Sequence, residues 1–196
     1  MRMRYLAIWA TGLISCAGLP LSQAALAATL PAQNSPGAEN NALLQRLSHA
    51  HWVAQGSGPR VLYMIFDPDC VSCHVVFDEL QPLIKAMDVT VRYVPVGYFT
   101  QSSSGKAAAI LEAKDPLAAI MKNEQEFNME HFGGLQEVLP TPATEKAMEE
   151  NLAILRATGQ SIVPTLIYRS RQGKTVIRRG RLDKGDLHSM LHDIAP

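Results

Sequence analysis

The arrangement of apolar residues predicts a strand, a helix and a second strand in the middle of the chain. Residues 61–66 are an unbroken apolar run after a Gly/Pro break, which is typical of a strand buried on both faces. Residues 89–96 alternate and are rich in β-branched side chains, so they predict a second strand. Between the two strands, apolar residues recur every three or four positions and predict one face of a helix: Val76, Phe77, Leu80, Leu83, Ile84 and Met87. These segments predict a βαβ unit.

The remainder of the chain predicts helices and a hairpin. Asp115-Pro116 and Thr141-Pro142 each combine a capping residue with a following Pro, which is a common start of a helix. Together with periodicity and turn residues, they predict helices over residues 106–113, from residue 116, over 142–157 and over 186–194, and a hairpin of strands 165–168 and 175–179. The order strand, helix, strand, helical block, hairpin, helix is that of an α/β fold.

Residues 1–27 have the features of an export signal. Arg2 and Arg4 precede an almost uncharged apolar run, and Ala25-Leu26-Ala27 offers a small-x-small cleavage site. We therefore expect a periplasmic protein from which residues 1–27 are removed. One alternative stays open, because residues 13–16 resemble the lipobox of bacterial lipoproteins, in which Cys16 is acylated and anchors the protein.

Residues 28–57 are expected to form a linker and a short helix ahead of a catalytic domain over residues 58–196. Residues 29–41 are rich in Ala, Pro and Asn without periodicity, which predicts a flexible linker. Leu43, Leu44 and Leu47 then predict the short helix. Within the domain, a helical block over about residues 98–158 separates the βαβ unit from the hairpin.

The charge balance argues against nucleic acid as a partner. The chain has 196 residues with 18 Lys plus Arg and 18 Asp plus Glu, so its net charge is zero and no basic excess is present to neutralise phosphates. Removal of residues 1–27 would also remove Cys16, one of three cysteines. The remaining pair, Cys70 and Cys73, would then reside in an oxidising compartment, where thiols are usually paired or redox-active.

Cys70 and Cys73 stand between the first predicted strand and the predicted helix. This position places Cys70 at the helix N-terminus, where free backbone N–H groups and the helix dipole stabilise a thiolate. Cys73, one turn later, can resolve the mixed disulfide that the thiolate forms. A purely structural disulfide is the alternative, but a four-residue loop gives only about 2 kcal/mol of stabilisation.

His74 extends the motif to Cys-x-x-Cys-His, which is also the attachment pattern of c-type haem. The haem interpretation stays open, although a βαβ pattern rather than a small helical domain surrounds the motif. A zinc site is disfavoured because no second ligand pair stands at metal spacing. We expect no metal and no cofactor. Asp67 and Asp69, which precede the site, are expected to be solvated acids of a turn. If they lie close to Cys70 instead, their negative charge would raise its pKa against the helix dipole.

Val163-Pro164-Thr165 opens the predicted hairpin, at a position where a strand tolerates Pro. Together with Cys-x-x-Cys opening the helix of a βαβ unit, this motif resembles the thioredoxin superfamily. Residues 66–73 and 106–116 are further similar to the DsbC/DsbG family of bacterial periplasmic disulfide isomerases, and the resemblance runs from about residue 60 to the end. It implies a thioredoxin-like fold with a helical insertion and a cis Pro164 beside the disulfide, with Val163, Val71 and Ser72 facing the substrate.

Three departures from that family affect what the resemblance implies. Residues 28–59 are too short for the family's N-terminal dimerisation domain, which implies a monomer. Val71-Ser72 differs from the family's active-site dipeptide, and Val163 stands where Thr usually precedes the Pro. Because both positions border the disulfide, the direction of net electron flow is left open.

The sequence thus predicts an exported thiol-disulfide oxidoreductase or isomerase that exchanges disulfides with protein substrates. Cys70 is the expected attacking thiolate, Cys73 the resolving thiol and Pro164 part of the site, and a membrane redox partner is expected to recycle the pair. The alternative is a chaperone-like binder of exported clients on the same fold. Its surface would be formed by aromatic residues that we otherwise expect in the core: Tyr98, Phe99, Phe127 and Phe132.

Overall fold

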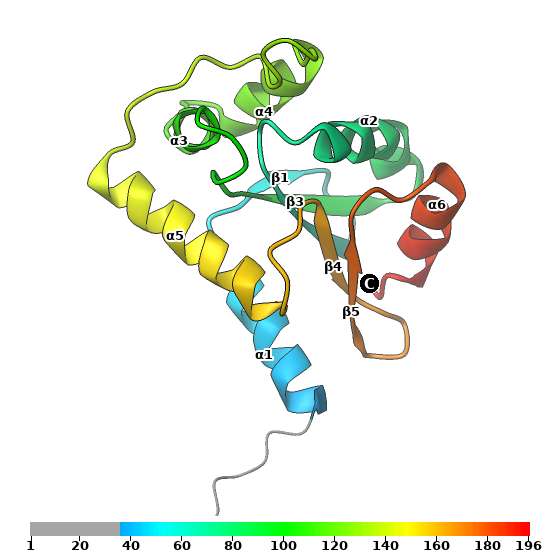
Figure 1. Cartoon of the computed structure of the whole chain (residues 1–196). Helices are drawn as coiled ribbons and strands as arrows, with labels where there is room; N and C mark the ends of the chain where they lie inside the picture. Colours follow the sequence, from blue (N-terminus) through cyan, green and yellow to red (C-terminus); the bar gives the residue numbers. More distant parts are fainter. Residues whose placement is uncertain (1–35) are drawn as a thin grey trace, which may run out of the picture. The chain divides into compact units, whose positions relative to one another are not determined.

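The computed structural model describes residues 36–196, and a five-stranded sheet lies at their centre (Figure 1). The expected signal peptide and Cys16 lie outside the described residues. The strands are β1 (Val53–Gln55), β2 (Arg60–Phe66), β3 (Val89–Pro95), β4 (Thr165–Arg169) and β5 (Thr175–Arg179). The helices are α1 (Pro36–Ser48), α2 (Val71–Ala86), α3 (Ser103–Leu111), α4 (Pro116–Gln125), α5 (Pro142–Ala157) and α6 (Lys184–Asp193).

The strand order in the sheet is β1-β3-β2-β4-β5. Strands β2 and β3 pair in parallel from Arg60 opposite Val89 to Phe66 opposite Pro95, and α2 connects them. The predicted βαβ unit is therefore confirmed. Strand β4 pairs antiparallel with both β2 and β5, so the predicted hairpin is confirmed as well.

The unbroken apolar run of β2 follows from burial on both of its faces. Successive strand residues point to opposite sides, and Leu62, Met64 and Phe66 join one hydrophobic cluster while Tyr63 and Ile65 join another. The first cluster also contains buried residues of α2, α4 and α6, and the second contains residues of α1 and α5. Helices therefore cover both faces of the sheet, as Figure 1 shows.

Two elements near residue 50 differ from the sequence prediction. Helix α1 begins at Pro36, inside the stretch expected to be a linker, and its Leu47 is fully buried in the second cluster. Strand β1 was not predicted, because a segment of three residues is too short to carry a periodic pattern. It pairs antiparallel with β3, and Val53 lies opposite Tyr93.

Helices α3, α4 and α5 occupy the chain between β3 and β4, where a helical block was expected. Asp115 accepts a hydrogen bond from the backbone N–H of Ala118 and Thr141 accepts one from that of Thr144, so both predicted helix starts are capped as the sequence indicates. Gly159, just after α5, has a positive φ of 89°, the left-handed conformation that commonly ends a helix. Among residues 36–196, no helix combines the length and the apolar character that crossing a membrane requires.

Candidate active site

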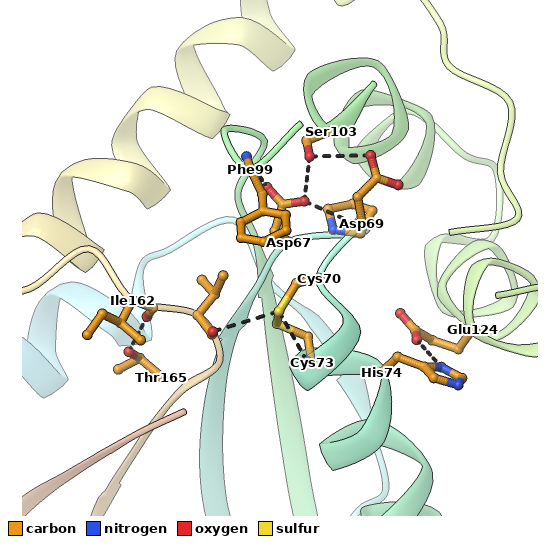
Figure 2. The surroundings of a disulfide bond; sticks show 12 residues. Asp67, Asp69, Cys70, Cys73, His74, Phe99, Ser103, Glu124, Ile162 and Thr165 are labelled. Carbon is orange, nitrogen blue, oxygen red and sulfur yellow. Dashed lines mark hydrogen bonds and ion pairs between the residues drawn. A yellow bond between two sulfur atoms is a disulfide. The ribbon is translucent and has the colours of Figure 1, made fainter. Parts of the chain in front are cut away.

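Cys70 and Cys73 form a disulfide at the start of α2 (Figure 2). Cys70 is the N-cap residue of the helix, and its Sγ accepts a hydrogen bond of 3.1 Å from the backbone N–H of Cys73. The Cys70 carbonyl accepts from the backbone N–H groups of both Cys73 and His74. The sulfur of Cys70 therefore lies where the free N–H groups of the helix favour negative charge.

The backbone of Val163 lies beside this disulfide. Its carbonyl oxygen is 3.7 Å from the Sγ of Cys70, and the Val163-Pro164 peptide bond is cis, as the resemblance implies. The turn before β4 is held by Thr165, whose hydroxyl donates 2.6 Å to the carbonyl of Ile162 (Figure 2). The structure thus brings Val163 next to the two cysteines, although Val163 lies 93 residues after Cys70 in the sequence.

Asp67 is buried, and the expectation that it is a solvated acid is wrong. One carboxylate oxygen accepts from the backbone N–H groups of Tyr98 and Phe99, and the other accepts 2.6 Å from the hydroxyl of Ser103. Burial raises the pKa of Asp67 above its ordinary value, and these hydrogen bonds oppose the rise. The loop between β2 and α2 is therefore joined to the segment that follows β3.

Asp69 is also fully buried, again contrary to expectation, and it pairs with a buried lysine. The Nζ of Lys106, on α3, lies 2.7 Å from one carboxylate oxygen, and the hydroxyl of Ser102 lies 2.6 Å from the other. Burial alone would raise the pKa of Asp69, but these donors and that of Thr100 outweigh it and hold the pKa below its ordinary value. The residue directly before Cys70 is thus an ionised carboxylate with a matching cation.

His74 contacts a second buried acid. Its Nδ1 lies 3.0 Å from the carboxylate of Glu124 on α4, its Nε2 lies 3.5 Å from that of Asp78, and its ring stacks on Phe127 at 4.4 Å. Burial raises the pKa of Glu124 to about 7, although hydrogen bonds from His74 and Asn123 oppose the rise. Among residues 36–196, no three His, Cys, Asp or Glu side chains are grouped so that they could hold a metal ion.

The surface around the cysteines carries exposed apolar side chains. Phe99 is 55% exposed, Ile162 43% and Tyr98 37%, and Figure 2 places Phe99 and Ile162 on two sides of Cys70. The Tyr98 hydroxyl donates a hydrogen bond of 2.9 Å to the carbonyl of Ser161. This bond joins the segment that carries Tyr98 and Phe99 to the segment that carries Ile162. The expectation that Tyr98 and Phe99 belong to the core is therefore wrong.

Some residues of the site were expected from the sequence, and others were not. Val71 and Ser72 occupy the first turn of α2 and are half-buried, as are Phe127 and Phe132. Lys106 and Glu124 were not singled out from the sequence. Lys106 opens an otherwise apolar run over residues 106–111. A charge on a helix face that is otherwise apolar could have indicated a buried ion pair, because a buried charge needs a partner.

Comparison with known proteins agrees with this geometry. The chain is 27% identical over 149 residues to the thiol:disulfide interchange protein DsbG of Pseudomonas aeruginosa, which covers 75% of this chain and 57% of that protein. It is 30% identical over 135 residues to the DsbG of Escherichia coli, covering 65% of this chain and 52% of that protein. The chain thus spans little more than half the length of these curated relatives.

Solved structures share the fold at lower sequence identity. The catalytic domain of Proteus mirabilis ScsC matches with a TM-score of 0.64 at 19% identity, covering 79% of this chain and 95% of that one. A periplasmic thioredoxin-like protein from Salmonella enterica serovar Typhimurium matches with a TM-score of 0.63 at 18% identity, covering 78% and 95%. The family model for the thioredoxin-like domain matches residues 47–195, so the chain belongs to the thioredoxin-like family.

Proposed function

We propose that the chain is an exported thiol-disulfide oxidoreductase that exchanges disulfides with protein substrates in the periplasm. The observation that carries the proposal is the position of Cys70 as the N-cap of α2, with its sulfur accepting the N–H of Cys73. A thiolate at this position is stabilised by the helix N-terminus, and a stabilised thiolate is the nucleophile of disulfide exchange.

The proposed reaction moves two electrons between sulfur atoms. In the reducing direction the Cys70 thiolate attacks a substrate disulfide, one substrate sulfur leaves as a thiolate, and a mixed disulfide forms. Cys73 then loses its proton and attacks Cys70, which releases the second substrate thiolate and leaves the Cys70–Cys73 disulfide. The oxidising direction is the reverse, and a membrane redox partner resets the pair. The Val163 carbonyl lies 3.7 Å from the Sγ of Cys70, Pro164 follows Val163, and Val71 and Ser72 stand between the two cysteines. These four residues would contact the substrate at the mixed-disulfide stage.

The contacts of His74 favour exchange over haem attachment. In a c-type haem site the two cysteines bind the haem and the histidine binds the iron. Here the ring nitrogens of His74 face Glu124 and Asp78 instead, and the ring stacks on Phe127. Both ring nitrogens of His74 therefore have partners within the protein, and neither is directed at a haem iron.

The proposal is tested by exchange with a fluorogenic peptide disulfide and by trapping. Cys73→Ser should accumulate a mixed disulfide with substrate, because the resolving thiol is missing, whereas Cys70→Ser should form none. Cys70→Ser should also abolish turnover. Undiminished turnover in Cys70→Ser would overturn the assignment of Cys70, and covalent haem in the purified periplasmic protein would overturn the function.

A chaperone-like activity is the second candidate, and the exposure of Phe99 and Tyr98 favours it. Such an activity needs the apolar surface but not the thiolate. Suppression of client aggregation that persists in Cys70→Ser while exchange is lost would separate the two functions. A monomeric state stays a prediction, which sedimentation of the mature protein tests.

A further inference from the structure

The active-site loop between β2 and α2 holds two buried carboxylates, from Asp67 and Asp69, and the buried cation Lys106 of α3 lies against it. Asp69 is fully buried and Lys106 is 6% exposed. Lys106 also donates 2.9 Å to the carbonyl of His131, and the backbone N–H of Gly133 donates 3.2 Å to Asp69. Charges so far from water are weakly screened, so each affects the electrostatic potential at neighbouring groups.

The sign of that potential matters at Cys70, the residue after Asp69. A negative charge close to a thiolate disfavours it, and a positive charge favours it. Without Lys106, the carboxylate of Asp69 would oppose the helix N-terminus that stabilises the Cys70 thiolate. With Lys106, the two opposite charges lie 2.7 Å apart and largely cancel beyond their own pair.

We propose that Lys106 is a positioning residue of the redox site, which by neutralising Asp69 keeps the thiolate form of Cys70 available for exchange. The inference rests on the proposed function and assigns to α3 a part in setting the reactivity of a cysteine on another element. Lys106 acts through Asp69 and not by contact with the sulfur. Ionisable groups near the site also include Asp67, which accepts a hydrogen bond from the Ser103 hydroxyl, and Tyr98, whose hydroxyl donates to the Ser161 carbonyl. His74, on the other side, is paired with Glu124 and Asp78.

A purely structural role for the ion pair makes a different prediction. If Lys106 and Asp69 only hold the loop together, removal of either partner loosens the loop and both variants change in the same direction. If the charge matters, Lys106→Met leaves an uncompensated carboxylate and Asp69→Asn leaves an uncompensated cation. The two substitutions then shift the Cys70 thiolate in opposite directions.

The experiment measures the alkylation rate of Cys70 by iodoacetamide between about pH 4 and 9, in the reduced full-length mature protein, with mass spectrometry to assign the site. Lys106→Met should raise the apparent pKa of Cys70 by about one unit, so that the rate at pH values below the wild-type pKa falls about tenfold, because one unit of pKa is there a tenfold change in thiolate. Asp69→Asn should lower the apparent pKa, and the double variant should return to the wild-type profile. Lys114→Met, an exposed lysine after α3, controls for net charge and should leave the profile unchanged.

Equilibration with glutathione gives a second readout that separates this inference from the proposed function. In Lys106→Met, glutathione should reduce the Cys70–Cys73 disulfide less readily, by about the same tenfold factor, because the thiolate belongs to the reduced form. Equal alkylation profiles in Lys106→Met and Lys114→Met, or shifts of the same sign in Lys106→Met and Asp69→Asn, overturn the role of Lys106. If Lys106→Met does not fold, an upward shift in Asp69→Asn alone overturns it and a downward shift supports it. A wild-type pair that does not exchange with glutathione overturns the proposed function, while the alkylation profiles still decide the role of Lys106.

Discussion

His74 directly follows the resolving cysteine, and its Nδ1 lies 3.0 Å from the carboxylate of Glu124. The Glu124 side chain is 3% exposed, and Asn123 on the same helix donates 3.2 Å to its second oxygen. Burial raises the pKa of Glu124 to about 7, with the negative charge of Asp78 adding to the rise and His74 opposing it. A buried group beside the cysteines therefore changes charge close to neutral pH.

This shift predicts how stability depends on pH. The unfolded chain loses the Glu124 proton near the ordinary carboxyl value of 4.5, and the folded chain loses it near 7. Between these values the folded state binds the extra proton, so the contribution of Glu124 to the free energy of unfolding is full below about pH 4.5 and declines as pH rises to about 7. Glu124→Gln cannot titrate. Its stability relative to wild type should therefore rise by roughly 2–3 kcal/mol between about pH 4.5 and 8.

Urea unfolding of both proteins across this range measures the difference. Glu126→Gln is the matched control, because Glu126 is exposed and follows α4 directly. It should show no pH-dependent difference from wild type. A Glu124→Gln difference that is constant with pH would contradict the raised pKa.

The packing of α1 and β1 predicts that the residues before residue 58 stabilise the folded domain. Leu43 and Leu47 of α1 are buried, as is Val53 of β1, and Asn151 of α5 donates to the carbonyl of His51. A chain over residues 58–196 lacks these side chains and exposes the apolar surface that they cover, at roughly 1.5–3 kcal/mol for each buried side chain. It should unfold at a clearly lower urea concentration than a chain over residues 34–196. Equal midpoints would mean that α1 and β1 contribute nothing to stability.

The exposed ring of Phe99 predicts a contribution to substrate binding. Its backbone N–H donates to Asp67, so the side chain can change while the loop stays held. Phe99→Ser should raise the KM for an apolar peptide disulfide about tenfold, corresponding to ~1.4 kcal/mol of lost contact, and should leave the alkylation of Cys70 unchanged. Leu139→Ser removes a 92% exposed side chain between α4 and α5 and serves as control. An equal KM effect in both variants would remove Phe99 from the substrate surface.

The sequence predicted the elements whose signal is local. Strand β2 is recognisable because both of its faces are buried, and Cys70 at a helix start follows from the strand-to-helix transition on either side of it. The cis state of Pro164 was implied by family resemblance and not by the local residues. Strand β2 and the helix start at Cys70, by contrast, each depend on a few adjacent residues.

The environment of the acidic residues could not be predicted, because their partners are distant in sequence. Ser103 lies 36 residues after Asp67, and Lys106 lies 37 residues after Asp69. A turn sequence rich in Asp and Pro is typical of a solvated loop, and only the packing of α3 against this loop makes it buried. The same applies to Glu124, which meets His74 across 50 residues.

Val163 gives the last prediction, because its backbone carbonyl and its side chain have different surroundings. The carbonyl lies 3.7 Å from the Sγ of Cys70, while the half-buried side chain packs against both hydrophobic clusters. In Val163→Thr a hydroxyl replaces one methyl group and can donate to the Cys70 thiolate, which Val cannot do. One such bond, at about 1.4 kcal/mol, should make the pair more oxidising by about 30 mV against glutathione. Val163→Ala shortens the side chain without adding a donor and should leave the potential unchanged. An unmoved potential in Val163→Thr, or the same shift in Val163→Ala, would show that the side chain at this position does not reach the sulfur.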